Sequence, residues 1–265
     1  SPAVGNKTVY VGSNDHKLYA VDLDGEERWH FETGDLIIGD PSVADGSVYV
    51  GSSDHNVYSL DSESGELRWV APTGNRVVSQ PVAHDGIVYA GSSDDNFYAY
   101  DATDGKTIWV FETDDSIYAN PVVGENRVFF GSTDHGFYAL DRHDGSELWS
   151  EHTRQRIVEA AAVWRDTVYF ANSLGWLHAV EAATGFRHWI SDELEPSVIC
   201  APTIADGLLY IGDRHGWLRT FDAESGDLLA KFETDNTVQS TPVVTDDTIY
   251  FGSNDGYFYA IEREF

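Results

Sequence analysis

The sequence predicts an all-β fold, a seven-bladed β-propeller of four-stranded antiparallel blades, with one blade three-stranded unless residues outside the chain close it. Three observations support this prediction. A similar stretch returns about every 40 residues, seven times in 265 residues. Each copy holds short β-branched and aromatic runs separated by Gly, Asp, Asn and Ser, which are strand and turn signals. No stretch shows the apolar spacing of a helix, and a fixed period of this length is typical of repeat architectures.

The landmark of each copy is a glycine that opens the pattern Gly-Ser-x-Asp-x-x-x-Tyr-Ala-x-Asp. It stands at Gly12, Gly51, Gly91, Gly131, Gly212 and Gly252, with Ala171 in the fifth copy. In the copy over residues 78–113, four expected strands, A to D in chain order, cover 78–83, 87–91, 96–101 and 107–111. Four strands in a unit of about 40 residues describe a propeller blade.

The seventh copy ends after its third strand, so we expect 27 strands. Because no linker interrupts the repeat, we expect one domain over residues 1–265. An alternative is that the chain is part of an eight-bladed ring. The absence of Met supports a fragment or a processed chain.

The composition is strongly acidic. Asp and Glu number 45 against 16 Lys and Arg, which gives a net charge of −29. Such a charge repels itself in dilute buffer and is screened by concentrated salt. An excess of Asp and only four Lys are similar to proteins of halophilic archaea. We expect no binding to nucleic acid or to an anionic membrane surface, since both need clustered Lys and Arg. We also expect no direct membrane insertion.

The single cysteine, Cys200, allows no intramolecular disulfide. The chain has no signal peptide and no apolar run long enough to span a membrane. We expect an extracellular or cell-surface location, with any leader or anchor outside this chain.

Residues 98–109, Tyr-Ala-Tyr-Asp-Ala-Thr-Asp-Gly-Lys-Thr-Ile-Trp, resemble the tryptophan-docking repeat of the PQQ-like, quinoprotein-type propellers. The repeat recurs with its tryptophan at Trp29, Trp69, Trp109, Trp149 and Trp189, whereas the sixth copy has Ala230 there. The resemblance covers the whole chain. It implies that each tryptophan packs against the neighbouring blade, which is a structural role.

The resemblance implies two kinds of function. Some members are dehydrogenases that bind PQQ and calcium at the ring axis, and others, such as the propeller lipoprotein of the outer-membrane β-barrel assembly machine, bind proteins. The alcohol dehydrogenases clamp PQQ with a disulfide between adjacent cysteines, which one cysteine cannot form. We therefore expect a non-catalytic, monomeric scaffold without cofactor that binds a protein or a small-molecule ligand. The alternatives are a PQQ- and calcium-dependent quinoprotein oxidoreductase and the sensor domain of a larger protein.

An axial ligand would be bound by residues that differ between copies, because strand A lines the axis of a propeller. Strand A residues and the D–A loops before them supply seven candidates: Asp40, Arg76, Gln80, Tyr118, Asn120, Arg156 and Glu159. Arg76 and Arg156 occupy the same place in two copies, and paired guanidinium groups suit a multi-carboxylate ligand. The alternative is that they neutralise nearby carboxylates.

Two other sets of repeated residues are interpreted as structural. His16, His55, His135 and His215 share the B–C turn of four different blades, too far apart for one zinc ion, so no metal site is predicted. Asp15, Asp54, Asp94, Asp134 and Asp255 recur at the same turn, where Asp bonds backbone N–H groups. Copies four and five depart most from the others, for instance at Trp164-Arg165 and at Asp192-Glu193-Leu194-Glu195. Trp176 and Trp217 either form an exposed patch or pack between blades, and packing is favoured.

Overall fold

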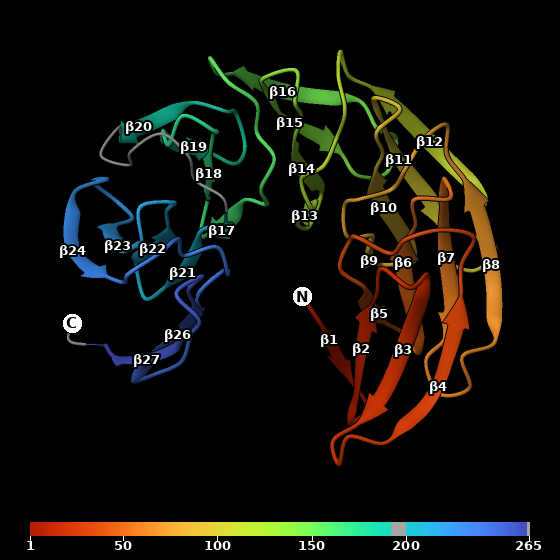
Figure 1. Ribbon diagram of the computed structural model, residues 1–265. Helices are drawn as coiled ribbons and strands as arrows, with labels where there is room; N and C mark the ends of the chain where they lie inside the picture. The colour runs from red at the N-terminus through yellow and green to blue at the C-terminus, as the bar shows by residue number, and fades with distance from the viewer. Residues whose placement is uncertain (192–199, 264–265) are drawn as a thin grey trace. The chain divides into compact units, whose positions relative to one another are not determined.

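The computed structural model describes residues 1–191 and 200–263, and every regular element in them is a β-strand. The strands form six four-stranded sheets and one three-stranded sheet (Figure 1). The predicted seven blades, the 27 strands and the incomplete last blade are therefore confirmed within these residues. Across the same residues, no helix long and apolar enough to cross a membrane occurs.

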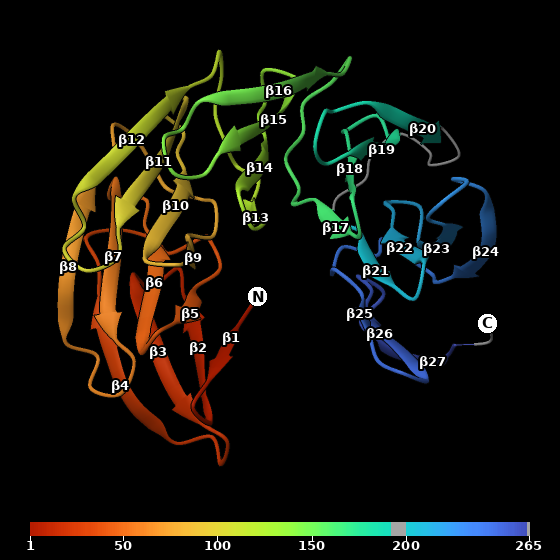
Figure 2. The same ribbon diagram turned by 180° about the vertical axis from the view of Figure 1, so that it is seen from behind.

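Six blades run A to D in chain order and the seventh runs A to C, and Figure 2 shows the same strands from behind. Blade one holds β1 (Ala3–Gly5), β2 (Thr8–Gly12), β3 (Lys17–Asp22) and β4 (Glu27–Glu32). Blade two holds β5 (Ser42–Ala44), β6 (Ser47–Gly51), β7 (Asn56–Asp61) and β8 (Leu67–Pro72). Blade three holds β9 (Val82–His84), β10 (Ile87–Gly91), β11 (Asn96–Asp101) and β12 (Thr107–Glu112). Blade four holds β13 (Val122–Val123), β14 (Arg127–Gly131), β15 (Gly136–Asp141) and β16 (Glu147–His152).

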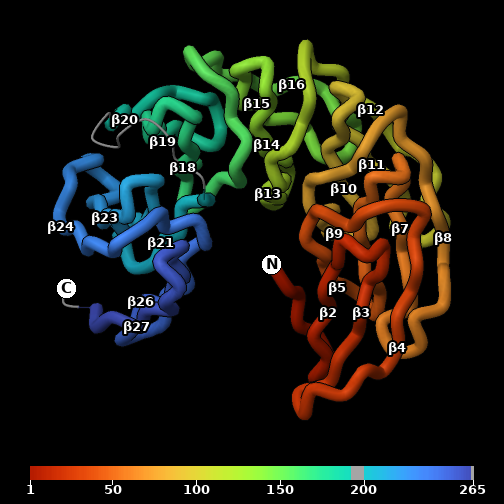
Figure 3. The backbone as a smooth tube through the Cα atoms, in the orientation of Figure 1, coloured from red at the N-terminus to blue at the C-terminus, as the bar shows by residue number. Residues whose placement is uncertain are grey.

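The remaining blades follow the same plan, and Figure 3 traces the backbone through them. Blade five holds β17 (Ala162–Trp164), β18 (Thr167–Ala171), β19 (Leu177–Glu181) and β20 (Arg187–Ser191). Blade six holds β21 (Thr203–Ala205), β22 (Leu208–Gly212), β23 (Trp217–Asp222) and β24 (Leu228–Glu233). Blade seven holds β25 (Val243–Val244), β26 (Thr248–Gly252) and β27 (Phe258–Glu262).

The chain forms two compact units, Ser1–Asp134 with Leu140–Glu147, and His135–Ala139 with Leu148–Phe265. Their boundary runs through blade four. A single domain over residues 1–265 stays a prediction.

Strand A is shorter than the sequence predicts. In blade three the expected strand over 78–83 is reduced to β9 (Val82–His84). Two features explain this. Pro81 has no backbone N–H to give to a ladder. The Ser79 hydroxyl instead bonds the backbone of Gly91, accepting from its N–H at 2.9 Å and donating to its carbonyl at 2.8 Å. Side-chain bonds thus replace ladder bonds at the start of the strand.

The core lies between successive blades. Leu18 and Ala20 on β3 pack with Val48 and Val50 on β6 of the next blade, and all four side chains are fully buried. The alternating period of two residues produces this layer, because one face of strand C meets strand B of its neighbour. In blade seven the corresponding strand C residue, Phe258, is 73% exposed.

The five repeat tryptophans lie in equivalent contacts with the following blade. Each indole N–H donates to a backbone carbonyl of that blade's C–D turn, at 2.8 to 3.3 Å: Trp29 to Ser62, Trp69 to Ala102, Trp109 to Arg142, Trp149 to Ala182 and Trp189 to Ala223. The ring lies on the glycine of the same turn. A Cβ added to Gly145 would stand 2.6 Å from the Trp109 ring, which only glycine avoids.

Blades six and seven use a different contact, because blade six has Ala230 in place of tryptophan. Arg263, buried at the end of the described chain, reaches back to blade six instead. Its guanidinium donates to the Tyr210 hydroxyl at 3.0 Å, to Asp206 at 2.7 Å and to the Ala205 carbonyl at 3.1 Å. An equivalent contact joins blades three and four, where Arg142 donates to Asp85 at 2.7 Å beside Trp109. Between blades six and seven the arginine contact is therefore kept and the tryptophan contact is absent.

Candidate functional site

The predicted axial residues divide between the two units. In the first unit, Gln80 donates its side-chain amide to the Pro41 carbonyl at 2.8 Å, and its backbone N–H donates to the Asn120 side chain at 2.7 Å. Asp40 pairs with the amino group of Ser1. Amide groups from strand A therefore connect blades two, three and four to one another. The structure gives Gln80 and Asn120 a stabilising role between blades.

Arg76 and Tyr118 lie in the D–A loops of the same unit. The Arg76 side chain is exposed, and its backbone carbonyl accepts from Ser93 N–H at 2.9 Å. Tyr118 is half-buried. Neither side chain is joined to Gln80 or Asn120 by a hydrogen bond, so these four residues do not form one connected polar cluster.

In the second unit, Arg156 is exposed and Glu159 is half-buried. Burial raises the pKa of Glu159 above the ordinary value of a glutamate. A carboxyl group with a raised pKa is a candidate general acid or base, although structural carboxyls show such shifts as well.

Cys200 lies near Glu159 and is fully buried. Its thiol accepts from Gly212 N–H at 3.1 Å, the same clamp that Ser79 and Ser240 make in blades three and seven. Burial, with the Glu159 charge as a smaller cause, raises the pKa of Cys200 to about 12. Because the thiolate is the reactive form, this cysteine is a packing residue rather than a nucleophile.

These residues do not fit the calcium and PQQ site of the family's dehydrogenases. The Gln80 side-chain nitrogen and the Asn120 side-chain oxygen are already bonded to protein groups. No group of three or more His, Cys, Asp or Glu in the described part of the chain is arranged to hold a metal ion. Calcium needs six or more oxygen ligands, so this donor set is too sparse.

The Asp and His residues of the B–C turns stabilise the turns and the loops next to them. Asp54 accepts from Asn56 N–H at 3.1 Å, from the Tyr58 hydroxyl at 2.7 Å and from Gly34 N–H at 2.6 Å. His16, His55 and His135 have φ between 72° and 78°, the left-handed region that such turns require. Asp54 therefore ties the D–A loop to the B–C turn.

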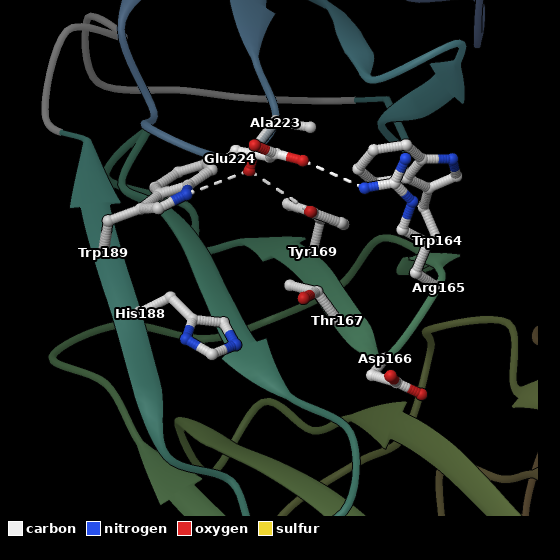
Figure 4. Close-up of a pocket in the computed structure, with 9 residues that line it drawn as sticks. All are labelled: Trp164, Arg165, Asp166, Thr167, Tyr169, His188, Trp189, Ala223 and Glu224. Atoms are coloured by element: carbon white, nitrogen blue, oxygen red, sulfur yellow. Dashed lines mark hydrogen bonds and ion pairs between the residues drawn. The ribbon is translucent and has the colours of Figure 1, made fainter.

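The most distinctive surface of the second unit lies on blades five and six. We call it the blade-five surface, and it consists of Trp164, Arg165, Phe186, His188 and Glu224. The Arg165 guanidinium lies 4.0 Å from the centre of the Trp164 ring and pairs with Glu224 at 2.9 Å (Figure 4). Phe186 is 69% exposed and contacts His188 edge to face, with 6.1 Å between ring centres.

Other blades carry polar residues where Phe186 stands. After the glycine of the C–D turn they have Glu26, Glu66, Lys106, Ser146 and Asp227. Arg165 is also an unusual residue for its position. Its φ is 52°, and the residues with a similar φ in the same turn of other blades are all aspartates: Asp45, Asp85 and Asp206. Asp tolerates this conformation better than a long side chain does. The signal in the sequence was the departure of copy five at Trp164-Arg165, but its function was not assigned.

Copies five and six differ from the repeat at three further places. Trp176 and Trp217 are both half-buried, and the Arg154 guanidinium lies 5.6 Å from the centre of the Trp176 ring. The acidic run Asp192-Glu193-Leu194-Glu195 lies outside the described residues.

Comparisons with known proteins agree on the architecture. A family model described as the β-propeller of the β-alanine-activating enzyme matches residues 1–262. Two curated relatives are the outer membrane protein assembly factor BamB of Escherichia coli strain K12 and that of Shigella dysenteriae serotype 1. Each is 29% identical over 80 residues, or 30% of this chain. The match covers only 20% of the length of either relative.

Solved structures extend the comparison to the whole chain. The computationally designed Ika8 protein superposes with a TM-score of 0.90 at 18% identity, over 99% of this chain and 83% of that one. BamB from Moraxella catarrhalis superposes with a TM-score of 0.67 at 16% identity, over 99% of this chain and 96% of that one. At such identities the likeness shows the fold.

Proposed function

Because the chain belongs to the β-propeller family of the β-alanine-activating enzyme, matched over residues 1–262, we propose that it is a non-catalytic scaffold that binds a protein partner. The observation that carries the proposal is the blade-five surface. Five of the other blades have a polar residue after the glycine of the C–D turn, whereas blade five has the exposed Phe186 there. In a repeat fold, function lies where one copy departs from the frame.

The composition of this surface suits protein recognition. Trp and Arg are enriched among the residues that dominate binding energy in interfaces, and Phe is enriched at interface cores. Trp164 is half-buried, and Phe186 leaves most of its ring in solvent. The exposed Phe186 ring contacts His188, and the stacked Trp164–Arg165 pair lies on the same blade, so this surface offers both apolar and charged groups, as interfaces do.

The relatives support the same class of function. The curated relatives are named as factors of outer membrane protein assembly, which is a role in assembling proteins rather than in a redox reaction. This likeness supports the proposal of an extracellular or cell-surface location. The net charge of −29 further supports a salt-adapted, acidic surface that selects against nucleic acids.

A quinoprotein oxidoreductase is the second candidate, favoured by one observation. Glu159 has the raised pKa that a general base would need. In this role Arg156, which lies in the same unit as Glu159, would pair with a carboxylate of the ligand. The bonded amides of Gln80 and Asn120 and the clamped thiol of Cys200 weigh against it.

Site-specific photocrosslinking tests the scaffold proposal. Benzoylphenylalanine is placed at Phe186 in one chain and at Lys106 in another, because Lys106 holds the equivalent exposed position of blade three. Crosslinking is carried out in cells that produce the chain. We expect a defined protein adduct from position 186 and none from position 106.

Two controls make the result specific. The adduct should decrease when unlabelled chain competes and when Trp164→Ala is added, while circular dichroism shows that the variant is folded. Identical adducts from both positions, or an adduct that Trp164→Ala leaves unchanged, would contradict binding through the blade-five surface.

A further inference from the structure

A hollow of about 300 Å³ opens beside the blade-five surface. Trp164, Thr167, Tyr169, His188 and Trp189 line it, with the Asp166 and Glu224 carboxylates and Arg165 also on its wall (Figure 4). The Trp189 indole and the Tyr169 hydroxyl both donate to the Ala223 carbonyl, at 3.0 and 3.2 Å, which fixes the inner wall. These groups are preorganised by the fold and need no rearrangement to form the cavity.

Blades one and two show one way in which this place is filled, although blades three, four and six have Ile108, Leu148 and Leu229 at the position in question. The residue before their docking tryptophan is arginine. Arg28 donates to the Thr8 hydroxyl at 2.8 Å, and Arg68 donates to the Ser47 hydroxyl at 2.5 Å and to Asp61 at 2.7 Å. In both blades a guanidinium therefore lies against the hydroxyl that begins strand B.

Blade five keeps the hydroxyl and loses the arginine. Thr167 begins its strand B, as Thr8 and Ser47 do, but His188 stands where Arg28 and Arg68 stand. An imidazole is shorter than an arginine side chain, so the space for the guanidinium is left open. Both Thr167 and His188 line the hollow, which is what this substitution predicts.

Blade five also has a larger aromatic wall than blades two, three and six. Trp164 ends strand A, where the corresponding turn residues of blades two, three and six are Ala44, His84 and Ala205. An indole face attracts a guanidinium by cation–π and stacking interactions. One face of the Trp164 ring already holds Arg165, whose charge is paired with Glu224. Asp166 leaves the wall with a net negative charge, which favours a cation over an anion.

We propose that this hollow binds the guanidinium of an arginine side chain that projects from a basic segment of the partner. The inference rests on the proposed scaffold function and names the chemistry of its partner. The inserted arginine would donate to Thr167, stack against the aromatic wall and lie near Asp166. It would repeat between two chains the contact that Arg28 and Arg68 make within one.

The test is titration of the folded chain with N-acetyl-arginine amide, followed by the indole N–H signals in NMR spectra. The signals of Trp164 and Trp189 are assigned through Trp164→Phe and Trp189→Phe. We expect saturable shifts of these two signals. The citrulline analogue has nearly the same shape without the charge, and it should bind at least ten times more weakly.

Two variants provide matched controls. His188→Arg places a guanidinium from the chain itself beside Thr167, and it should reduce binding of the probe at least tenfold. Leu148→Arg makes the same change of charge at the equivalent position of blade four and should leave binding unchanged. Equal binding of the citrulline analogue, undiminished binding to a folded His188→Arg variant, or no shift at all would overturn the proposal.

The outcome is separable from that of the scaffold proposal. A specific adduct at position 186 without binding of the arginine probe would retain the scaffold and reject the pocket. Binding of the probe without any adduct would retain the pocket and reject the scaffold.

Discussion

Replacing Trp109 by alanine should destabilise the chain by about 3–5 kcal/mol, as large-to-small changes of buried aromatic residues do. Trp109 is 9% exposed and packs with its ring centre 5.9 Å from that of Tyr89 and 6.0 Å from that of Phe97. An aromatic side chain of this size buries about 150–250 Å², so lost burial alone accounts for roughly 4–6 kcal/mol as an upper value.

The hydrogen bond of the indole contributes little to this cost. The Arg142 carbonyl accepts from Trp109 at 3.1 Å and also from the Tyr89 hydroxyl at 3.0 Å. Removing the indole N–H therefore leaves the carbonyl satisfied. Trp109→Phe, which keeps most of the ring, should cost only about 1–2 kcal/mol.

Glycine substitutions separate the ring contact from backbone strain. Gly145 and Gly86 both have positive φ, 73° and 77°, but a Cβ at Gly145 would meet Trp109 whereas one at Gly86 meets nothing within 4 Å. Gly145→Ala should therefore cost more than Gly86→Ala, and the excess should shrink in a Trp109→Ala background. Urea denaturation measures each free energy of unfolding. A cost below about 1 kcal/mol for Trp109→Ala, or additive effects of Trp109→Ala and Gly145→Ala, would refute the reasoning.

Three further predictions concern charge. The melting temperature should rise strongly between 0.1 M and 2 M KCl, since salt screens the net charge of −29, and an unchanged melting temperature would contradict this. The nearby His178 and the Arg187 guanidinium lower the pKa of Glu151, so Glu151→Gln should lose about 1–2 kcal/mol at pH 7. A carboxylate whose pKa is lower in the folded chain stabilises the fold at pH values above the pKa of the unfolded chain. The loss caused by Glu151→Gln should therefore fade as the pH drops below about 4, and a loss that does not depend on pH would exclude this cause. Burial raises the pKa of Glu159, so its ionisation opposes folding as pH rises, and Glu159→Gln should melt higher than wild type at pH 7 but not at pH 4.

Much of the fold could be predicted because each blade repeats the same local chemistry. Turn residues and strands with a period of two residues recur at the same positions of each copy, so the strands assigned in one copy can be assigned in the other six. The length of strand A could not be predicted, since the bond between Ser79 and Gly91 replaces ladder pairing. The link from Arg263 to blade six was equally hidden, because its partner Asp206 lies 57 residues away.

The candidate site was less predictable, because it depends on contacts between residues that lie far apart in the sequence. Gln80 and Asn120 have the residue types of a ligand site, and only the structure shows that their amides bond across blades. The sequence singled out Trp164 and Arg165 as departures from the repeat. It could not show that Phe186 stays exposed, or that His188 leaves open the space that Arg68 fills in blade two.

The central claim, a scaffold without redox catalysis, is tested most directly by loading the folded chain with PQQ and calcium in high salt and measuring dye reduction. The quinone absorbance reports binding in the same sample, and alcohols and sugars serve as substrates. We predict no substrate-dependent dye reduction, whether or not the quinone binds. Turnover that requires PQQ and is lost in Glu159→Gln would contradict the account and establish the oxidoreductase.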